Sequence, residues 1–435
     1  MREMKDSGVE WIGEIPVDWK LSKIKHHFSI SSGTTPKSDE PEYWDGDIVW
    51  ITPADFKTDD VFVSKGHRNL SLEGYMVSSL QLVPAGNIIF SKRAPIGQVV
   101  INAIDLCTNQ GCLTVVLNDD SDVRFYRYIM SIATEEFELA GSGTTFKEIS
   151  ATSFGNILLP LTSKQEQTKC ADYLDIKCSK IDEIIEKQQA IIEKLKEYKI
   201  SIITEVVTKG LDYEVDYKES GTEWLGKIPS HWQYLSFKNV LKERNEKNFP
   251  VKTAERLSLS IDKGVTLYSE KTTNLDRFKD DVSQYKLAHE GDFVLNSMNM
   301  IVGAVGISHY FGCVSPAYYT YYDNEEDHIT AKYCDYLFHS KTVKKVLHSL
   351  GKGIMSIDRG DDRINTCRLK VSRTDLRALK IPVPPICEQR EIVKYLQSKE
   401  NLIDKTIADR NKAIDKLQEY KKSLIYEVVT GKKEV

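Results

Sequence analysis

The sequence predicts an α+β protein in which two mixed α/β domains are separated by two long helices that form an antiparallel coiled coil, with approximate twofold symmetry. Two repeated blocks and an apolar heptad stripe support this prediction. Residues 6–19 recur as 219–232 with eight of fourteen positions identical, among them Trp19 and its counterpart Trp232. An internal repeat of this kind indicates a duplicated frame.

A second block repeats at a constant offset of 222 residues. It starts with Leu159-Pro160 and Ile381-Pro382, and it ends with Glu205-Val-Val-Thr208 and Glu427-Val-Val-Thr430. The first block repeats at an offset of 213, so all nine additional residues fall between the two blocks, where the halves share little sequence. The frame is therefore duplicated, while its contents differ.

These blocks divide the chain into four expected segments. They are a first globular domain over 1–160, a central helical spacer over 161–210, a second globular domain over 211–382 and a C-terminal helical spacer over 383–435. In the globular domains, short β-like runs separated by Gly, Pro, Asn and Ser predict strands at 47–51, 87–90, 97–101, 113–117, 292–295 and 304–307. Amphipathic stretches at 125–139 and 333–350 predict one helix each.

The coiled coil is predicted from apolar residues that alternate at spacings of three and four in both copies of the second block. The expected seam, which doubles as a candidate surface for docking partners, consists of Ile181, Ile184, Ile191, Leu195, Tyr198 and Ile202 in the first copy and Ile403, Ile407, Leu417, Tyr420, Leu424 and Val428 in the second. In the alternative interpretation, each helix covers only the core of its own domain.

The ends of these helices carry recognisable signals. Ser163-Lys-Gln-Glu166 is typical of a capping box at the start of a short preceding helix. Pro384-Pro385 ends the strand before the second helix, and Gly210 and Gly431 follow the last apolar positions, where a C-terminal cap is expected.

Charge is unevenly distributed over a chain whose formal net charge is −5. Residues 20–160 carry a net charge of −5, whereas 234–380 carry +4. The excess includes a basic cluster of Arg359, Arg363, Arg368, Lys370, Arg373, Arg377 and Lys380. Such a cluster fits either a phosphate backbone or a solvated face.

Other features exclude several classes of protein. The charged N-terminus predicts no secretory signal, and no apolar run reaches the roughly 18 residues needed to span a bilayer. The eight cysteines form no CxxC pair, so we expect free thiols and no metal site.

Four polar loops in the first domain, at 31–37, 91–97, 108–111 and 141–147, offer side chains suited to nucleic acid. Arg and Lys suit guanine edges and phosphates, and Asn and Gln suit adenine. With two asparagines at the strand end near 296 and two arginines of the basic cluster, the candidate DNA-binding residues are Thr34, Thr35, Lys37, Lys92, Arg93, Asn109, Gln110, Ser142, Thr144, Lys147, Asn296, Asn299, Arg359 and Arg363. An ordinary solvated turn explains any one of these loops equally well.

The chain resembles the specificity subunits of type I restriction–modification enzymes. The resemblance is carried by Gly-x-Glu-Trp-Ile/Leu-Gly-x-Ile-Pro-x-x-Trp in both copies, Gly33-Thr-Thr-Pro36, Trp50-Ile-Thr-Pro-x-Asp55, Pro382-x-Pro-Pro-x-x-Glu-Gln389 and the Glu-x-Tyr-Lys helix endings. It covers essentially the whole chain. One departure is Leu161-Thr-Ser163, where the family has a proline-rich turn.

This resemblance implies a subunit without catalytic activity, located in the cytoplasm with the nucleoid. Each globular domain would be a target-recognition domain that reads one half of a bipartite site in double-stranded DNA. The paired helices would dock two modification subunits, which bind S-adenosylmethionine and methylate adenine, and two restriction subunits would use ATP and Mg²⁺. A rod of roughly 27 residues at ~1.5 Å each is about 40 Å long, or about a dozen base pairs.

Two other functions remain open. Ser315-Pro-Ala-Tyr318 is similar to the Asn/Asp/Ser-Pro-Pro-Tyr motif of adenine methyltransferases but lacks the second proline, and no suitably placed glycine-rich loop accompanies it. A coiled-coil scaffold without DNA readout agrees with the acidic first domain but not with two dissimilar domains on identical frames. The sequence contains no P-loop motif.

Overall fold

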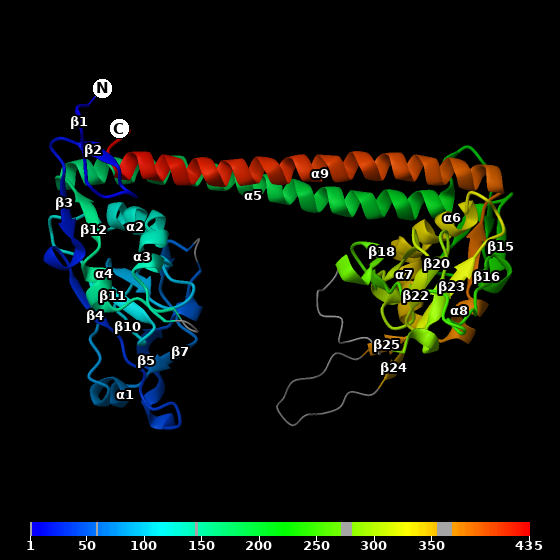
Figure 1. Cartoon of the computed structure of the whole chain (residues 1–435), viewed down its shortest axis with the longest axis horizontal. Helices are drawn as coiled ribbons and strands as arrows, with labels where there is room; N and C mark the ends of the chain where they lie inside the picture. Colours follow the sequence, from blue (N-terminus) through cyan, green and yellow to red (C-terminus); the bar gives the residue numbers. More distant parts are fainter. Residues whose placement is uncertain (1, 58–59, 144–146, 271–280, 355–367) are drawn as a thin grey trace. The chain divides into compact units, whose positions relative to one another are not determined.

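The computed structural model describes residues 2–57, 60–143, 147–270, 281–354 and 368–435. The chain forms two compact units (Figure 1). Unit 1 comprises residues 1–188 and 411–435, and unit 2 comprises residues 189–410. Over the described ranges, none of the helices combines the length and apolar character that crossing a membrane requires.

Unit 1 is built on a five-stranded sheet in the order β4-β11-β8-β9-β6. Its strands are Ser29–Ser32 (β4), Cys112–Val116 (β11), Ile88–Ser91 (β8), Val99–Asn102 (β9) and Phe62–Val63 (β6). A second sheet has the order β10-β5-β7, formed by Cys107–Thr108, Trp44–Ile51 and Arg68–Leu70. Two-stranded pairs join β1 to β2 and β3 to β12, with the bounds Met4–Asp6, Glu14–Pro16, Lys20–Lys23 and Leu158–Leu161.

Unit 2 has a four-stranded sheet in the order β16-β23-β20-β21. Its strands are Lys242–Glu243 (β16), Tyr318–Tyr322 (β23), Phe293–Asn296 (β20) and Val305–Ile307 (β21). The two-stranded pairs are β13 Tyr217–Glu219 with β14 Lys227–Pro229, β15 Gln233–Ser236 with β26 Lys380–Val383, β17 Leu257–Ser260 with β18 Gly264–Leu267, β19 Lys286–Ala288 with β22 Gly312–Val314, and β24 Lys352–Ile354 with β25 Arg368–Lys370.

The two sheets share one topology although their sequences differ. The order β4-β11-β8-β9 in unit 1 matches β16-β23-β20-β21 in unit 2, and all of these pairings are antiparallel. The pair β3/β12 likewise matches β15/β26. The duplication therefore extends from the repeated blocks into the domain cores, and all six runs predicted as strands contain strands.

Short helices cover the sheets and correct the prediction of one long helix in each domain. Unit 1 contains α1 Leu72–Val77, α2 Val123–Ile132, α3 Thr134–Leu139 and α4 Ala151–Gly155, and unit 2 contains α6 Ile329–His339, α7 Lys341–Leu350 and α8 Arg373–Ala378. The stretch 125–139 is broken at Ala133, and 333–350 is broken at Ser340, which has extended backbone and caps α7 by accepting a hydrogen bond from Val343 N. A capping serine lets the chain change direction between two helices, which apolar periodicity does not reveal.

The first repeated block places a fully buried tryptophan in each unit. Trp19 lies in the core of unit 1, edge-on to Phe125, and Trp232 lies in the core of unit 2. A Cβ atom on Gly431 would lie 3.3 Å from the Trp19 ring, and one on Gly210 would lie 3.3 Å from the Trp232 ring. Both glycines have positive φ and follow the last turn of a long helix. The tryptophan of each copy of the first repeated block therefore packs against the C-terminal end of a long helix.

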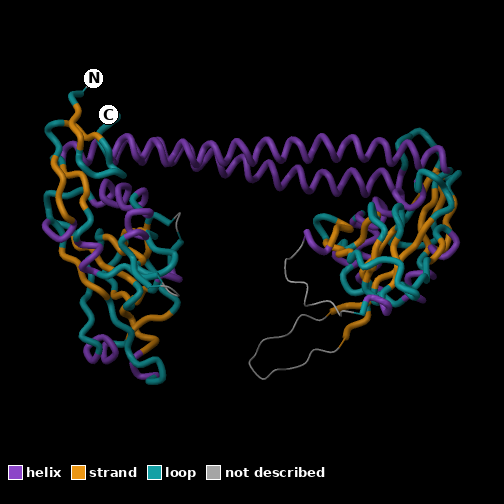
Figure 2. The backbone as a smooth tube through the Cα atoms, in the orientation of Figure 1, coloured by secondary structure: helices purple, strands orange, loops and turns teal. Residues whose placement is uncertain are grey.

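Two helices of 46 and 44 residues, α5 Lys164–Lys209 and α9 Ile386–Val429, run side by side within each unit (Figures 1 and 2). In unit 1, Lys421 Nζ lies 2.6 Å from Asp182 Oδ1, and in unit 2, Lys199 Nζ lies 2.9 Å from Asp404 Oδ2. Lower numbers on one helix therefore face higher numbers on the other. The predicted antiparallel pairing is confirmed within both units.

The predicted seam differs from the protected positions at four residues, which are Ile184, Ile191, Tyr198 and Tyr420. Ile184, Tyr198 and Tyr420 are 44%, 52% and 54% exposed, whereas Ile192 and Ile414, which the prediction omitted, are each 6% exposed. The protected positions recur at 181, 185, 188, 192, 195, 199 and 202 on α5, and at the same positions plus 222 on α9. Ile184/Ile185 and Ile191/Ile192 are adjacent apolar pairs, so both choices satisfy a three-four alternation, and only packing selects between them.

The first helical signal also differs from expectation. Ser163 Oγ accepts a hydrogen bond from Glu166 N, as a cap should, but the residues after it form the first turns of α5 and no separate short helix. The Glu166 carboxylate accepts a hydrogen bond from Arg2 at 2.7 Å instead of closing the capping box.

Candidate nucleic-acid interface

The polar loops of unit 1 converge on one surface, here called loop cluster 1 and defined as 33–37, 91–98, 108–111, 141–143 and 147–149. Thr34 N donates to Thr108 O at 3.1 Å, which joins the first loop to the third. Lys92 N donates to Gly111 O at 3.0 Å, and Ile149 N donates to Lys92 O at 3.0 Å. Four loops that the sequence singled out separately thus lie side by side.

Gly33 is required for this convergence. A Cβ atom at Gly33 would lie 1.9 Å from the backbone oxygen of Thr108. No side chain fits there without moving the backbone, so Gly33-Thr-Thr-Pro36 owes its glycine to close approach between two loops.

Asp55 organises the neighbouring turn, a role that the sequence analysis did not assign. Its Oδ2 accepts hydrogen bonds of 2.7 Å from both the backbone and the hydroxyl of Thr52, and its Oδ1 accepts one of 2.8 Å from His67 N. Burial acts to raise the pKa of Asp55, but hydrogen bonds from His67 and Thr52 outweigh burial and lower the pKa below its usual value. The Thr-Pro-x-Asp motif was the available signal, because it is a capping box.

The two cations of loop cluster 1 share one carboxylate. Lys92 Nζ lies 3.0 Å from Glu148 Oε1, and Arg93 Nε lies 2.8 Å from Glu148 Oε2. The Lys92 side chain is 12% exposed and that of Arg93 is 48% exposed. Burial acts to raise the pKa of Glu148, but the hydrogen bonds from both cations outweigh burial and lower the pKa. Arg93 is therefore the more available of the two for an external phosphate.

Asn109 and Gln110 differ although they are neighbours. The Asn109 Oδ1 atom accepts a hydrogen bond from Gly111 N at 2.9 Å, so this amide supports its own turn. Gln110 is exposed, and its Oε1 atom accepts a hydrogen bond from the hydroxyl of Thr35. Of these two neighbouring residues, Gln110 is the one whose amide is exposed to solvent.

The other described candidates of unit 1 also belong to the loops that form loop cluster 1. Lys37 and Lys147 are exposed, and Ser142 exchanges two backbone hydrogen bonds of 2.9 Å with Glu148. Thr144 lies outside the described residues.

Unit 2 presents an equivalent loop after β20. Val371 N donates to Ser297 O at 3.0 Å, which repeats the bond from Ile149 N to Lys92 O, and the two donors differ by the repeat offset of 222. Asn296 Oδ1 accepts from Met298 N at 3.0 Å and supports the turn, whereas Asn299 is exposed. Arg359 and Arg363 lie outside the described residues.

Part of the predicted basic cluster is paired internally. Arg373 Nη2 lies 2.7 Å from Glu243 Oε1, and Arg377 Nη1 lies 3.0 Å from Glu243 Oε2. The Glu243 side chain is 7% exposed, so it holds both guanidinium groups against the domain. These two arginines contribute to the structure of unit 2, beyond whatever they offer to a phosphate.

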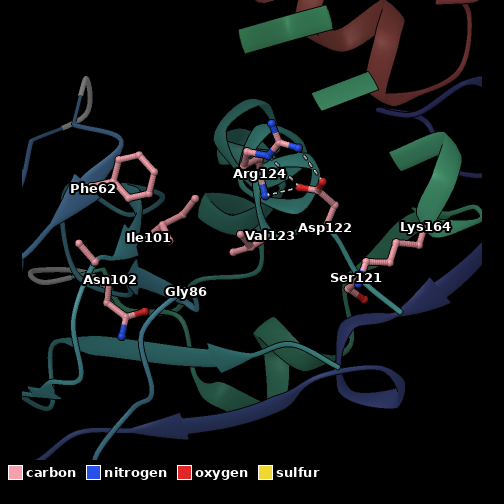
Figure 3. A pocket seen from close by; sticks show the side chains of 10 residues that line it. Phe62, Gly86, Ile101, Asn102, Ser121, Asp122, Val123, Arg124 and Lys164 are labelled. Carbon is pink, nitrogen blue, oxygen red and sulfur yellow. Dashed lines mark hydrogen bonds and ion pairs between the residues drawn. The ribbon is translucent and has the colours of Figure 1, made fainter. Parts of the chain in front are cut away.

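A depression of about 520 Å³ in unit 1 involves none of the candidates (Figure 3). Phe62, Ile101 and Val123 give it an apolar lining beside Arg124. Arg124 is held by Asp122 and two further carboxylates on α5, and the hydrogen bond that Arg124 donates to Asp122 is the main cause of its raised pKa. This guanidinium is committed to joining α2 to α5.

Ser315-Pro-Ala-Tyr318 forms a tight turn before β23, in which Tyr318 N donates to Ser315 O at 2.9 Å. Within the described ranges, no group of three or more His, Cys, Asp or Glu side chains is arranged to hold a metal ion.

Comparisons with known proteins agree with this architecture. The family model of the type I restriction modification DNA specificity domain matches twice, at residues 16–197 and 229–416. The MjaIX specificity subunit of Methanocaldococcus jannaschii, a type I restriction enzyme subunit, is 32% identical over 249 residues, which are 55% of each chain. The MjaVIII specificity subunit of the same organism is 21% identical over 96% of this chain and 93% of its own length.

The first of these relatives matches over only about half of its length. Among solved structures, one described as the structural basis of complex assembly and conformational transition of the type I R-M system superposes with a TM-score of 0.68 at 14% identity, covering 95% of this chain and 98% of that one. The HsdS subunit of Thermoanaerobacter tengcongensis gives a TM-score of 0.52 at 14% identity, covering 96% and 98%. At this identity the structural likeness shows the fold alone. Because the family model covers most of the sequence in two copies, the chain belongs to the type I restriction modification DNA specificity family.

Proposed function

We propose that this chain is the sequence-reading, non-catalytic subunit of a type I restriction–modification enzyme and that each globular domain binds one half of a bipartite target in double-stranded DNA. The domains proposed for this division are 1–160 and 211–382, with the helical spacers 161–210 and 383–435. One observation carries the proposal: a shared sheet topology presents different loops at equivalent places. Lys92-Arg93 follows β8 where Ser297-Met298 follows β20. Two domains that share one framework but carry different loops are suited to recognise two different DNA sequences.

The acidic first domain is compatible with this role because its cations are placed locally. In loop cluster 1, the side chains of Lys37, Arg93, Lys147 and Gln110 are all exposed. Phosphate contacts need cations at the contact surface, whatever the net charge of the domain. In unit 2, Asn299 is the corresponding exposed candidate, and Arg359 and Arg363 remain proposed contacts.

Two exposed tyrosines on the long helices, which lie outside the buried seam, suit the docking of partner subunits. Tyr198 and Tyr420 lie at equivalent positions of the second block and are similarly exposed. Tyr198 lines a depression of about 350 Å³ with Glu205 and Tyr395. Each of these two residues has an identical counterpart 222 positions away, Glu427 for Glu205 and Tyr173 for Tyr395. Two equivalent surfaces suit two copies of one partner, and exposed tyrosine is a frequent anchor of protein interfaces.

In this proposal the partners are two modification subunits and two restriction subunits. S-adenosylmethionine belongs to the former, ATP and Mg²⁺ belong to the latter, and this chain holds no cofactor. Because the substrate is chromosomal and invading DNA, the complex would act in the cytoplasm at the nucleoid.

A domain exchange tests the proposal. Residues 20–158 are replaced by those of a relative, the chain is co-expressed with its modification subunits, and methylated adenines are mapped genome-wide. One half of the methylated sequence should change and the other should remain. Loss of both halves would contradict independent readers, and methylation without sequence preference would favour a scaffold.

A further inference from the structure

The loop that joins β10 to β11 is fixed at every backbone position that surrounds Gln110. Asn109 N donates to Ile51 O at 2.9 Å, and Cys112 N donates back to Asn109 O at 3.1 Å. Gly111 O accepts from Lys92 N at 3.0 Å, and Gly111 N donates to Asn109 Oδ1 at 2.9 Å. Gln110 therefore projects from a turn held by two other segments of unit 1.

The Gln110 side chain is exposed, and one hydrogen bond orients its amide. Thr35 Oγ1 donates to Gln110 Oε1, which places the amide nitrogen on the side away from Thr35. A carbonyl oxygen has two lone pairs, so Oε1 keeps one for a second donor, and both amide hydrogens are available. The loop that carries Thr35 is itself held beside this turn, because Thr34 N donates to Thr108 O at 3.1 Å.

An amide with one acceptor and one donor side by side matches adenine. In the major groove, adenine offers N7 as an acceptor and the N6 amino group as a donor, and no other base offers that pair in that order. An amide whose orientation is already set loses less entropy when it binds, so its contact with the matching base is stronger.

We propose that Gln110 reads one adenine of the half-site bound by the first domain and that Thr35 is the positioning residue that orients its amide. The inference rests on the proposed function and deepens it. Gln110 Nε2 donates to adenine N7, and the adenine amino group donates to Gln110 Oε1. Asn109, the neighbouring amide, is half-buried and supports its own turn, so the proposal assigns the base contact to the exposed Gln110.

The test uses the complete complex of this chain with its modification subunits. Methylation rates are measured on oligonucleotide duplexes in which each position of both half-sites is replaced in turn by the other three base pairs. The variants are Gln110→Ala, Gln110→Glu, Thr35→Val, which removes the hydroxyl at constant shape, and Thr35→Ser, which keeps it. Gln81→Ala is the matched control, because Gln81 is an exposed glutamine of the same unit outside loop cluster 1.

Wild type should prefer adenine at one position of the first half-site by roughly 5- to 140-fold, the range expected for one bidentate contact. Gln110→Ala and Gln110→Glu should lose the preference at that position alone, and the second half-site should be read as before. Thr35→Val should weaken the same preference, Thr35→Ser should restore it, and Gln81→Ala should change nothing. Retained reading of the second half-site shows that each variant is folded.

Two results would overturn the inference while leaving the proposed function intact. In one, both Gln110 variants keep every base preference of the first half-site. In the other, the position they alter is not an adenine. If the wild-type complex instead shows no sequence preference in either half-site, the proposed function itself fails.

Discussion

The ammonium group of Lys199 on α5 lies 2.9 Å from Oδ2 of Asp404 on α9. The same pair occurs a second time, because adding 222 to Lys199 gives Lys421 and subtracting it from Asp404 gives Asp182, and these two lie 2.6 Å apart. Each helix thus contributes the lysine of one pair and the aspartate of the other. The direct repeat of the sequence produces reciprocal contacts because the two helices pair antiparallel.

Charge reversal at Asp182 and Lys421 tests this pairing. Asp182→Lys or Lys421→Asp alone places like charges together and should lower the free energy of unfolding by ~0.5 to 1 kcal/mol, the range for a partly exposed ion pair. The double reversal should recover most of the loss in urea unfolding. A double variant as unstable as the sum of the singles would show that the pair makes no contribution.

Substitutions along α5 and α9 separate seam positions from exposed ones. Ile192→Ala and Ile414→Ala should each cost about 2 to 4 kcal/mol, because each removes a buried side chain and leaves a cavity. Ile184→Ala is the control and should cost less than about 1 kcal/mol, since its side chain is 44% exposed. Equal losses at 184 and 192 would return the seam to the positions first expected.

The pH dependence of stability should report on Asp55. Its pKa is lowered in the folded chain, so its contribution is fully present above the unfolded value near ~4 and is lost as pH falls through the folded value. Asp55→Asn should therefore destabilise the protein by about 1 to 3 kcal/mol at pH 7, and the difference from wild type should shrink below pH 4. Urea unfolding at several pH values measures it; a difference that stays constant down to pH 2 would argue against the carboxylate.

Glu148 should restrain non-specific binding of DNA. Glu148→Gln releases Lys92 and Arg93 from their shared partner, so affinity for unrelated duplex DNA should rise. The slope of log K against log salt should steepen by about 1 to 2, because each additional phosphate contact adds ~0.9. Glu138→Gln, on the adjacent helix α3, is the charge-matched control. An unchanged slope would show that the two cations do not reach phosphate.

Spacer length should set the distance between half-sites. One heptad inserted after Leu195 and another after Leu417 preserve the seam, since both positions belong to it at the repeat offset. Seven residues at ~1.5 Å add about 10 Å, so the gap in the methylated sequence should widen by about 3 base pairs. Mapping of methylated adenines measures the gap, and an unaltered gap would show that the helices do not determine it.

The positions of the loops that form the candidate site could be predicted from the sequence, but the contacts between those loops could not. The sequence identified 31–37, 91–97, 108–111 and 141–147 because small and amide residues interrupt β-like runs there. It could not show that Asn109 supports its own turn while Gln110 is oriented by Thr35, since that bond joins residues 75 positions apart. The sequence also gave no role to Asp55, which accepts a hydrogen bond from the backbone of His67, a residue 12 positions away just before β7.

The duplicated frame, the long helices and the family could all be predicted from the amino-acid sequence, because repeats and heptad periodicity are local patterns along the chain. The antiparallel pairing of the helices was one of two interpretations that the sequence left open, and the structure selected it. Three features became clear only from the folded chain: Ile192 is buried while Ile184 is exposed, Ser340 separates two helices, and two domains with little sequence in common share one sheet topology. All three have the same cause. Local patterns leave several low-energy choices open, and only packing against residues distant in the chain removes all but one.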